Sequence, residues 1–375
     1  MQPLRVVLVI GLLFAAGAAR GDGPVVGWGL DTEGQATPPD PVNGKSGTAN
    51  AIAAGHAHAC AIQADSASVV CWGRNFDGEA TPPPGLLASS IATGSTDACA
   101  IRQGTNSGKV LCWGGNNHGQ ATAPPTVNGT SGTASAIAAG TNHSCAIQTG
   151  TDAVICWGDD TFGQATPPPS VDGTAGTAAR IATGALHSCA IQRGSGAVIC
   201  WGNGSNGEST PPSSVDGTGG TALAIAAGSA HSCAIQAGSY AVVCWGGSVS
   251  FPATPPPTVD GTSGTASAIA AGNYHTCAVQ RETGAAICWG SNVDGESDLY
   301  PPVDGVSGAA VAVAGGANFS LAIQAPEPEA ALLELASIGV LLVRRAPGRE
   351  QIGARRVARE AKLRLRAAPR SANFL

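Results

Sequence analysis

Histidine recurs at one position of a repeated pattern, two residues before a cysteine. This position carries histidine in five units and another residue in two more: His58, His143, His187, His231, His275, Asp97 and Phe319. Imidazoles are common zinc ligands, but a tetrahedral site needs its ligands at short range, and one histidine per unit does not provide that. We therefore expect a repeated packing and hydrogen-bonding position, with no metal and no other cofactor.

A second repeated position places aspartate or asparagine before glycine, at Asn43, Asn128, Asp172, Asp216, Asp260 and Asp304. Calcium loops draw several oxygen ligands from closely spaced residues, whereas each of these segments offers one. An Asx-Gly turn explains the pattern better. No Gly-x-Ser-x-Gly motif, phosphate-binding loop or paired-carboxylate motif stands out in the sequence. We therefore predict no catalytic residues and no enzyme activity.

The cysteines occur as ordered pairs, separated by 11 residues in five cases and by 13 in the second. Two positions at this separation face each other across a β-hairpin, where the spacing of a non-hydrogen-bonded pair suits a disulfide. Zinc would require Cys-x-x-Cys or Cys/His spacing, which is absent. We predict six disulfides: Cys60/Cys71, Cys99/Cys112, Cys145/Cys156, Cys189/Cys200, Cys233/Cys244 and Cys277/Cys288.

Seven Trp-Gly pairs set the period of the chain, at Trp28, Trp72, Trp113, Trp157, Trp201, Trp245 and Trp289. The intervals are 44 residues, with a single interval of 41. Each unit offers four short β segments: Ala-Ile-Ala-Ala, His-x-Cys-Ala-Ile, Val-x-Cys-Trp and a stretch before a pair of prolines. Four strands in a repeated unit of this length are the signature of a β-propeller.

The two ends of the repeat region complement each other. Residues 310–324 hold the first two segments of a unit, and residues 25–28 hold the third. We therefore predict an all-β, seven-bladed propeller over residues 24–324, with one blade closed by N- and C-terminal half-repeats. In that blade the cysteine positions carry Leu321 and Gly27, so both partners are replaced together, as facing residues would be.

The segments Gly140-Thr-Asn-His143-Ser-Cys145-Ala-Ile147 and Cys112-Trp113-Gly114 through Gly119-Gln120 resemble regulator of chromosome condensation repeats. The resemblance spans about residues 25–324 and implies a seven-bladed propeller. That family includes nuclear exchange factors for a small GTPase and a secreted bacterial β-lactamase inhibitory protein with similar short units. The motif from Trp157 to Gln164 is closer to the secreted type. Because the chain is acidic and rich in cysteine, we do not transfer the exchange function.

Residues 1–19 are typical of a secretory signal peptide. Arg5 precedes an apolar run, and Ala16-Gly17-Ala18 offers small residues for cleavage. Export would also permit disulfides. We therefore expect a secreted or envelope-associated protein.

The sequence changes character over residues 325–345. Pro326-Glu327-Pro328, a 14-residue apolar stretch and Arg344-Arg345 resemble the PEP-CTERM sorting signals of exosortase-containing bacteria, which retain a secreted protein transiently at the membrane. The stretch is shorter than the ~20 residues of a membrane span. Such signals normally end after the arginines, whereas this chain continues as a basic tail, residues 346–375, which we expect to be disordered or helical.

Charge is divided unevenly along the chain, whose net charge is −6. Ten of the 19 Lys and Arg residues lie from Arg344 onward, together with only two of the 25 acidic residues. The remaining, acidic part lacks the positive surface that phosphate binding requires, so we expect no nucleic-acid partner. The predicted function is that of a monomeric scaffold that binds a protein or a glycan. The alternatives are a propeller enzyme acting on an envelope or extracellular polysaccharide, and a purely structural envelope component.

The least repetitive residues fall in two loops that strand order places on one face of the propeller. These are the turn between the first and second segments and the loop after Trp-Gly. Propellers build binding faces from such variable loops on a constant scaffold, although ordinary surface variation explains the pattern equally well. The candidate binding residues are His56, Arg74, Phe76, His118, Asp160, Phe162, Leu186, Phe251, Asn273 and Tyr274.

Overall fold

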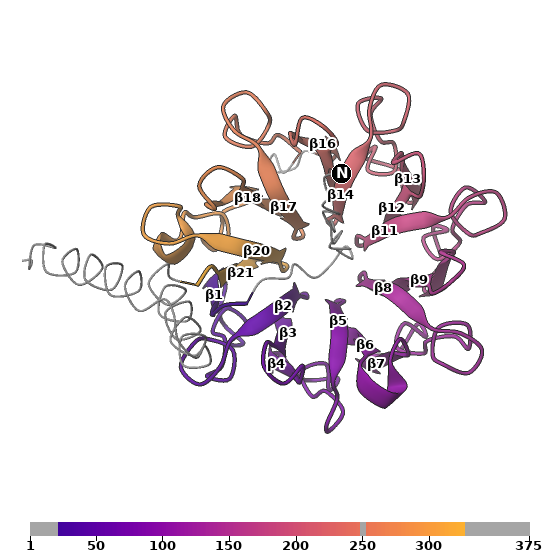
Figure 1. Cartoon of the computed structure of the whole chain (residues 1–375), viewed down its shortest axis with the longest axis horizontal. Helices are drawn as coiled ribbons and strands as arrows, with labels where there is room; N and C mark the ends of the chain where they lie inside the picture. Colours follow the sequence, from indigo (N-terminus) through magenta and orange to yellow (C-terminus); the bar gives the residue numbers. More distant parts are fainter. Residues whose placement is uncertain (1–21, 248–252, 327–375) are drawn as a thin grey trace, which may run out of the picture. The chain divides into compact units, whose positions relative to one another are not determined.

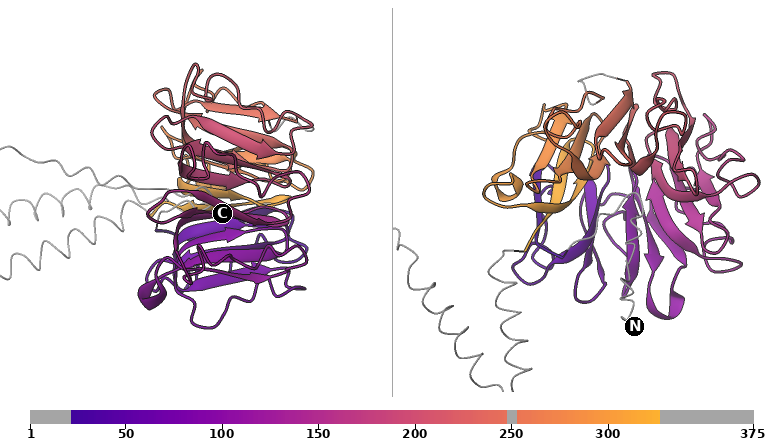
Figure 2. Two further views of the ribbon diagram at one scale, coloured as in Figure 1. Left: turned by 90° about the vertical axis from the view of Figure 1, so that its right-hand side faces the viewer. Right: turned by 45° about the horizontal axis from the view of Figure 1, so that its top comes forward.

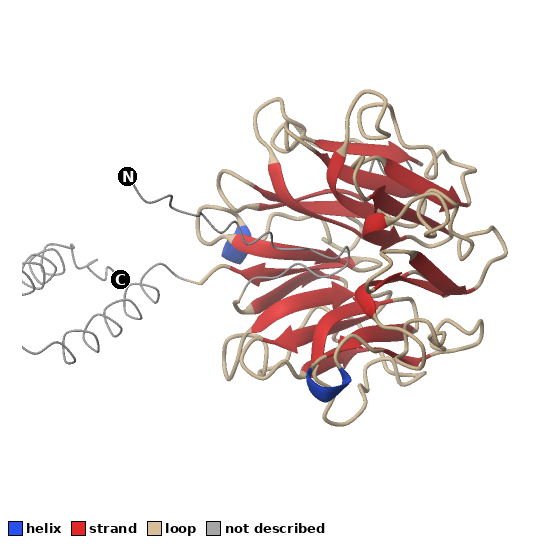
Figure 3. Ribbon diagram, turned by 45° about the vertical axis from the view of Figure 1, so that its right-hand side comes forward, coloured by secondary structure: helices blue, strands red, loops and turns tan. Residues whose placement is uncertain are grey.

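The computed structural model describes residues 22–247 and 253–326. These residues form seven three-stranded antiparallel sheets, arranged as blades around a central axis (Figure 1). Figure 2 shows the blades edge-on in its left view and tilted around the central axis in its right view. Two short 3-10 helices, η1 (Gly104–Asn106) and η2 (Pro301–Val303), lie in the loops (Figure 3). The predicted all-β, seven-bladed propeller is therefore confirmed.

Several predictions from the sequence concern residues outside the described ranges. They concern residues 1–19, Phe251, and the sorting and tail segments beyond Pro326, which include Glu327, Pro328, Arg344 and Arg345. Pro326 is described and is exposed. No helix within residues 22–247 and 253–326 is long and apolar enough to cross a membrane.

Each blade repeats the same three strands from the centre outward (Figure 1). The innermost strands are β2 (Ala49–Ala54), β5 (Ala88–Thr93), β8 (Ala134–Ala139), β11 (Ala178–Thr183), β14 (Ala222–Ala227), β17 (Ala266–Ala271) and β20 (Ala310–Gly315). The middle strands are β3 (His58–Gln63), β6 (Asp97–Arg102), β9 (His143–Gln148), β12 (His187–Gln192), β15 (His231–Gln236), β18 (His275–Gln280) and β21 (Phe319–Gln324). The outer strands are β1 (Val25–Gly29), β4 (Val69–Gly73), β7 (Val110–Gly114), β10 (Val154–Gly158), β13 (Val198–Gly202), β16 (Val242–Gly246) and β19 (Ala286–Gly290).

The core lies between the blades. The middle strand β9 is buried along its first five residues, because a neighbouring blade covers each of its faces. The outer strand β10 instead buries Val154 and Trp157 and leaves the residues between them half-buried. One apolar cluster joins Ile147 and Val154 of this blade to Ile181 and Trp201 of the next, and six similar clusters fill the other spaces between blades.

The fourth strand that the sequence predicts in each unit does not form, and this prediction is wrong. The stretch before the prolines makes turns, as where Thr210 N–H donates to the Gly207 carbonyl at 3.0 Å. The outer strand instead bonds to a residue after the prolines, from Val198 N–H to the Val215 carbonyl at 2.9 Å. Proline has no N–H and cannot extend a ladder of hydrogen bonds. Val215 itself donates to the Pro212 carbonyl, which holds it in a turn.

The blade that contains β1 is built from two distant segments of the chain. Strand β1 pairs with β21, which pairs with β20, and Gly27 faces Leu321 at the position that cysteines occupy elsewhere. A cluster that contains Trp72 and Phe319 packs this blade against the blade of β2 to β4. On its other side, the indole Nε1–H of Trp28 donates to the Glu296 carbonyl at 3.1 Å.

All six predicted disulfides are formed: Cys60–Cys71, Cys99–Cys112, Cys145–Cys156, Cys189–Cys200, Cys233–Cys244 and Cys277–Cys288. Each joins directly opposite residues of a middle and an outer strand, as Cys145 and Cys156 do in β9 and β10. Since disulfides persist where the surroundings are oxidising, the six bonds indicate such a compartment.

Candidate functional site

The two variable loops of each blade lie on the same face. The residue two places after each tryptophan donates its backbone N–H to the turn between the innermost and middle strands. Arg74 bonds in this way to the Ala57 carbonyl at 2.9 Å, and Asp159 to the Asn142 carbonyl at 2.8 Å. We call this face, made of the turns equivalent to residues 55–57 and the loops after Trp-Gly, the Trp-Gly rim.

The turns of the Trp-Gly rim are joined from blade to blade. His56 N–H donates to the Gly94 carbonyl at 3.3 Å, and Ala317 N–H donates to the Gly55 carbonyl at 3.2 Å. A Cβ atom on Gly55 would lie 2.5 Å from the Gly94 carbonyl oxygen, so only glycine allows this approach. The backbone of the rim is therefore rigidly supported.

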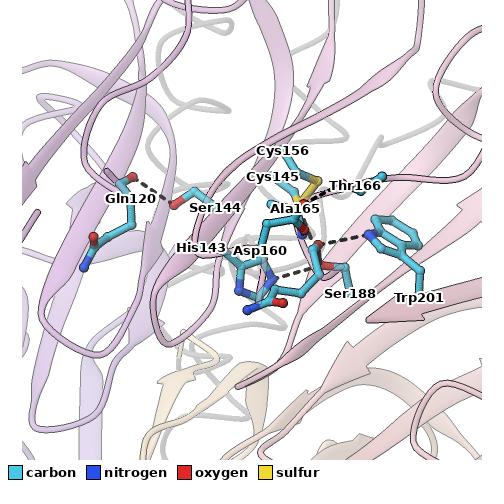
Figure 4. Close-up of a disulfide and its surroundings, with 11 residues drawn as sticks. Gln120, His143, Ser144, Cys145, Cys156, Asp160, Ala165, Thr166, Ser188 and Trp201 are labelled. Atoms are coloured by element: carbon cyan, nitrogen blue, oxygen red, sulfur yellow. Dashed lines mark hydrogen bonds between the residues drawn. A yellow bond between two sulfur atoms is a disulfide. The ribbon is translucent and has the colours of Figure 1, made fainter. Parts of the chain in front are cut away.

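The loop after Trp157 illustrates how the rim loops are braced from within. The buried side chain of Gln164 accepts a hydrogen bond from Phe162 N–H at 2.8 Å. The Asp160 carboxylate accepts bonds from Ala165 N–H at 2.8 Å and from the Thr166 hydroxyl at 2.6 Å (Figure 4). Although Asp160 is exposed, both of its carboxylate oxygens thus hold the loop.

A buried network connects adjacent blades beneath the rim. Trp201 Nε1–H and the Ser188 hydroxyl both donate to the Gln164 carbonyl of the preceding blade, each at 3.0 Å. Because Ser188 donates its proton there, it accepts a hydrogen bond from His143 Nε2, 2.9 Å away (Figure 4). The same pairing occurs in His187–Ser232, His231–Thr276 and His275–Ser320.

This network confirms the hydrogen-bonding interpretation of the repeated histidine. Burial lowers the pKa of His143 to about 4, so its imidazole is neutral at physiological pH. Within the described ranges, no group of three or more His, Cys, Asp or Glu side chains could hold a metal ion. The carboxylates of the Asx-Gly turns also bond within their own turn. The Asp172 carboxylate, for example, accepts hydrogen bonds from the N–H and the hydroxyl of Thr174.

Two neighbouring blades break the pairing. His58 faces a blade with Ala98 in place of serine, and neither ring nitrogen has a hydrogen-bond partner. Asp97 replaces histidine in that next blade, and both of its buried oxygens are also without a hydrogen bond. Burial raises the pKa of Asp97 to about 8. In the blade of β1, by contrast, Phe319 occupies the position of the histidine, and Ala59 occupies the position of the serine in the next blade. Neither side chain therefore needs a polar partner.

Substitution Asp97→Asn is expected to stabilise the protein, increasingly so as the pH rises. Because burial raises the pKa in the folded state from 3.8 to about 8, the stability linked to this proton is present below pH 3.8 and is lost as the pH rises through 8. The gain should grow from near zero at pH 4 to about 5 kcal/mol at pH 8. Urea unfolding at several pH values measures it. The exposed control Asp77→Asn should show no such trend, and a gain for Asp97→Asn that does not change with pH would contradict the explanation.

The candidate rim residues differ in how freely they can meet a partner. Phe76, Phe162, Tyr274, His56, His118 and Asp160 are exposed, whereas Arg74, Leu186 and Asn273 are half-buried. Phe76 extends furthest into solvent, with 82% of its surface exposed. Arg74 lies under it, with its guanidinium carbon 6.0 Å from the centre of the Phe76 ring.

Arg74 is itself fixed by a buried carboxylate. Its Nε–H donates to Glu79 Oε1 at 2.9 Å, and Glu79 is fully buried. Burial acts to raise the pKa of Glu79, but hydrogen bonds from Arg74 and from the Asp77 backbone outweigh it, so the pKa lies below its usual value. This ion pair therefore holds in place the Arg74 side chain that lies against Phe76.

One exposed apolar residue of the rim was missed from the sequence. Val293 is 86% exposed and lies four residues after its tryptophan, which is the position of Phe76 in its own loop. Only Phe76, Val249 and Val293 are apolar at that position, and Val249 lies outside the described residues. Comparing this loop position across units would have identified Val293.

The family model for the regulator of chromosome condensation (RCC1) repeat matches residues 134–164 and 266–296. Each match runs from the start of an innermost strand to the buried Gln164 or Glu296 of the loop after Trp-Gly. No curated protein sequence matches the chain significantly.

Solved structures show the same fold at low sequence identity. Saccharomyces cerevisiae Prp20p is similar at a TM-score of 0.66 with 18% identity, over 86% of this chain and 96% of that one. Human WBSCR16 gives 0.61 with 16% identity, over 80% and 100%. The ectodomain of the Arabidopsis thaliana receptor kinase ACR4 gives 0.57 with 23% identity, over 72% and 87%.

Proposed function

Because the chain carries regulator of chromosome condensation (RCC1) repeats on a disulfide-stabilised propeller, we propose that it is an exported scaffold that binds a partner through the Trp-Gly rim. The partner is a protein or a glycan at the cell envelope or outside the cell, and we favour a protein. The similar yeast structure is described together with its binding to Gsp1p and histones. Another similar structure is a receptor-kinase ectodomain.

The observation that carries this proposal is the exposure of apolar side chains on a rigid rim. Phe76, Phe162, Tyr274 and Val293 are all exposed there. An interface gains most from large side chains whose backbone is already ordered, because little conformational entropy is lost on binding. Hydrogen bonds within loops and between blades provide that order, as Gln164 does beneath Phe162.

Three further features support export to an oxidising compartment. The six disulfides suit such a compartment. Residues 1–19 have the pattern of a secretory signal, and residues 325–345 have the order of an envelope sorting signal. We further propose that the propeller is monomeric, and that its acidic charge excludes nucleic acid as a partner.

Alanine substitutions at the rim should weaken partner binding strongly without unfolding the protein. The test captures partners from extracellular and envelope fractions with the folded, oxidised protein, and compares it with the variant Phe76→Ala/Phe162→Ala/Tyr274→Ala/Val293→Ala. Since residues at the centre of an interface commonly contribute about 2 kcal/mol or more, affinity for the captured partner should fall at least about 30-fold.

Val306→Ala is the matched control. Val306 is 93% exposed but belongs to an Asx-Gly turn at the opposite ends of the strands. It should leave binding and thermal melting unchanged. Binding that survives the rim variant, or that is lost equally in Val306→Ala, would exclude the Trp-Gly rim. Turnover of envelope polysaccharide without a captured partner would favour the enzyme alternative instead.

A further inference from the structure

The ends of all seven innermost strands surround a cavity of about 630 Å³. These strands end in alanine, threonine or glycine, so their short side chains leave space at the centre of the ring. Ile225 and Ile269 extend the apolar wall between β14 and β17, and Tyr240 adds an aromatic ring. Cavities of roughly 300–1,000 Å³ with mostly apolar walls are typical of small-molecule sites.

The charged residues that line this cavity are all of one sign. Arg180 and Arg281 line it, and no Asp, Glu or His does. The described residues contain only seven Lys and Arg in all, and their net charge is negative. Two of these seven line the same cavity, so the wall of the cavity is positively charged although the propeller as a whole is acidic. Arg281 stacks over Tyr240, with its guanidinium carbon 3.8 Å from the centre of the ring.

Arg180 breaks the repeat at its position. The other six innermost strands carry small residues there, at Ala51, Ser90, Ala136, Ala224, Ala268 and Ala312. Arg180 is half-buried, and it has no salt bridge within the described ranges. Arg74 and Arg193, by contrast, pair with Glu79 and Asp152. Burial acts alone on Arg180 and lowers its pKa, with no neighbouring charge in compensation.

We propose that the central cavity binds a small organic anion with an apolar body. The anionic group pairs with Arg180, and the body packs against the alanine and isoleucine walls and the Tyr240 ring. A partly buried cation without a counter-charge is unfavourable, and a ligand that supplies the counter-charge in a low-dielectric site gains a strong, charge-assisted contact. This site is separate from the Trp-Gly rim and does not depend on the rim's having a partner.

Two fluorescent probes of nearly the same shape test the proposal on the folded, oxidised protein. 8-Anilinonaphthalene-1-sulfonate carries an anionic group, whereas N-phenyl-1-naphthylamine has the same aromatic body without it. We expect each probe to bind with 1:1 stoichiometry. Arg180→Met should weaken binding of the sulfonate by about tenfold or more, because the charged hydrogen bond is lost. Binding of the neutral probe should change by less than about twofold, since methionine preserves the apolar stem.

Two further variants separate charge from packing. Arg180→Lys should retain most of the sulfonate affinity, because it keeps the positive charge. Arg102→Met removes a charge at the end of β6, outside the cavity lining, and should have no effect. The proposal is overturned by equal loss of both probes in Arg180→Met, by unchanged sulfonate binding in that variant, or by the absence of 1:1 binding to the unmodified protein.

Discussion

Reduction of the six disulfides is expected to unfold the propeller at temperatures where the oxidised protein is stable. Each disulfide closes a loop with a sequence separation of 11 or 13 residues and contributes about 2–3 kcal/mol by restricting the unfolded chain. Six such bonds sum to roughly 15 kcal/mol, which is as large as the whole stability of many domains. Thermal melting followed by circular dichroism, with and without a phosphine reductant, should show a decrease in Tm of more than about 20 °C.

The blade of β1 supplies a matched control for a single bond. Its Gly27 and Leu321 occupy the places of the cysteines, and the leucine fills the space that the glycine leaves. The double variant Cys145→Leu/Cys156→Gly should therefore keep the packing and lose about 2–3 kcal/mol from one bond.

The reduction experiment has a clear contrary outcome. If the fully reduced protein melted within a few degrees of the oxidised one, the packing between blades alone would suffice for stability.

Mild acid should unfold the protein through its buried histidines. Burial lowers the pKa of His58, His143, His231 and His275 to about 4 and that of His187 to about 3. The unfolded chain takes up these protons below pH 6.5, whereas the folded protein does not. The associated stability is therefore complete above pH 6.5 and is lost as the pH falls towards 4. At about 3 kcal/mol per histidine, the protein should lose its fold before pH 4.

The substitution His58→Phe separates this cause from general acid sensitivity. It reproduces the arrangement in the blade of β1, where phenylalanine is followed by alanine in the next blade, as Phe319 is by Ala59. Because the His58 ring nitrogens have no hydrogen-bond partners, the variant loses no hydrogen bond and removes one titrating group. Between pH 7 and pH 5, urea unfolding should show a loss of stability about 2 kcal/mol smaller than in the unmodified protein. An unchanged loss would assign the acid sensitivity to other groups.

The period and the paired cysteines were sufficient to predict the blade count, the six disulfides and the split blade. These features follow from short-range spacing, because facing residues of a hairpin lie at a constant separation in sequence. The fourth strand was the wrong step. Proline is tolerated at a sheet edge, yet the stretch before the prolines makes turns and the outer strand bonds to Val215 beyond them.

The sites depend on contacts between blades, which sequence spacing does not report. The sequence shows that Arg180 departs from the small residues of the equivalent positions, but its place in the wall of a cavity follows only from the arrangement of the seven innermost strands. Likewise, the bond between His143 and Ser188 joins residues 45 positions apart. Strand order correctly placed the two variable loops on one face. That Asp160 braces its loop while Phe76 is exposed follows only from the three-dimensional arrangement.

The blade assembled from distant segments constrains the order in which the molecule forms. Each disulfide joins residues close in sequence, so a hairpin can oxidise soon after it emerges, whereas the bond from Trp28 to Glu296 spans 268 residues. Contacts at such separation carry a large loop-closure entropy and form late. Until β21 pairs with β1, the apolar surface around Trp72 that later meets Phe319 stays uncovered. We therefore expect the arc of blades to close last, and the chain to be most exposed to aggregation and proteolysis before it closes.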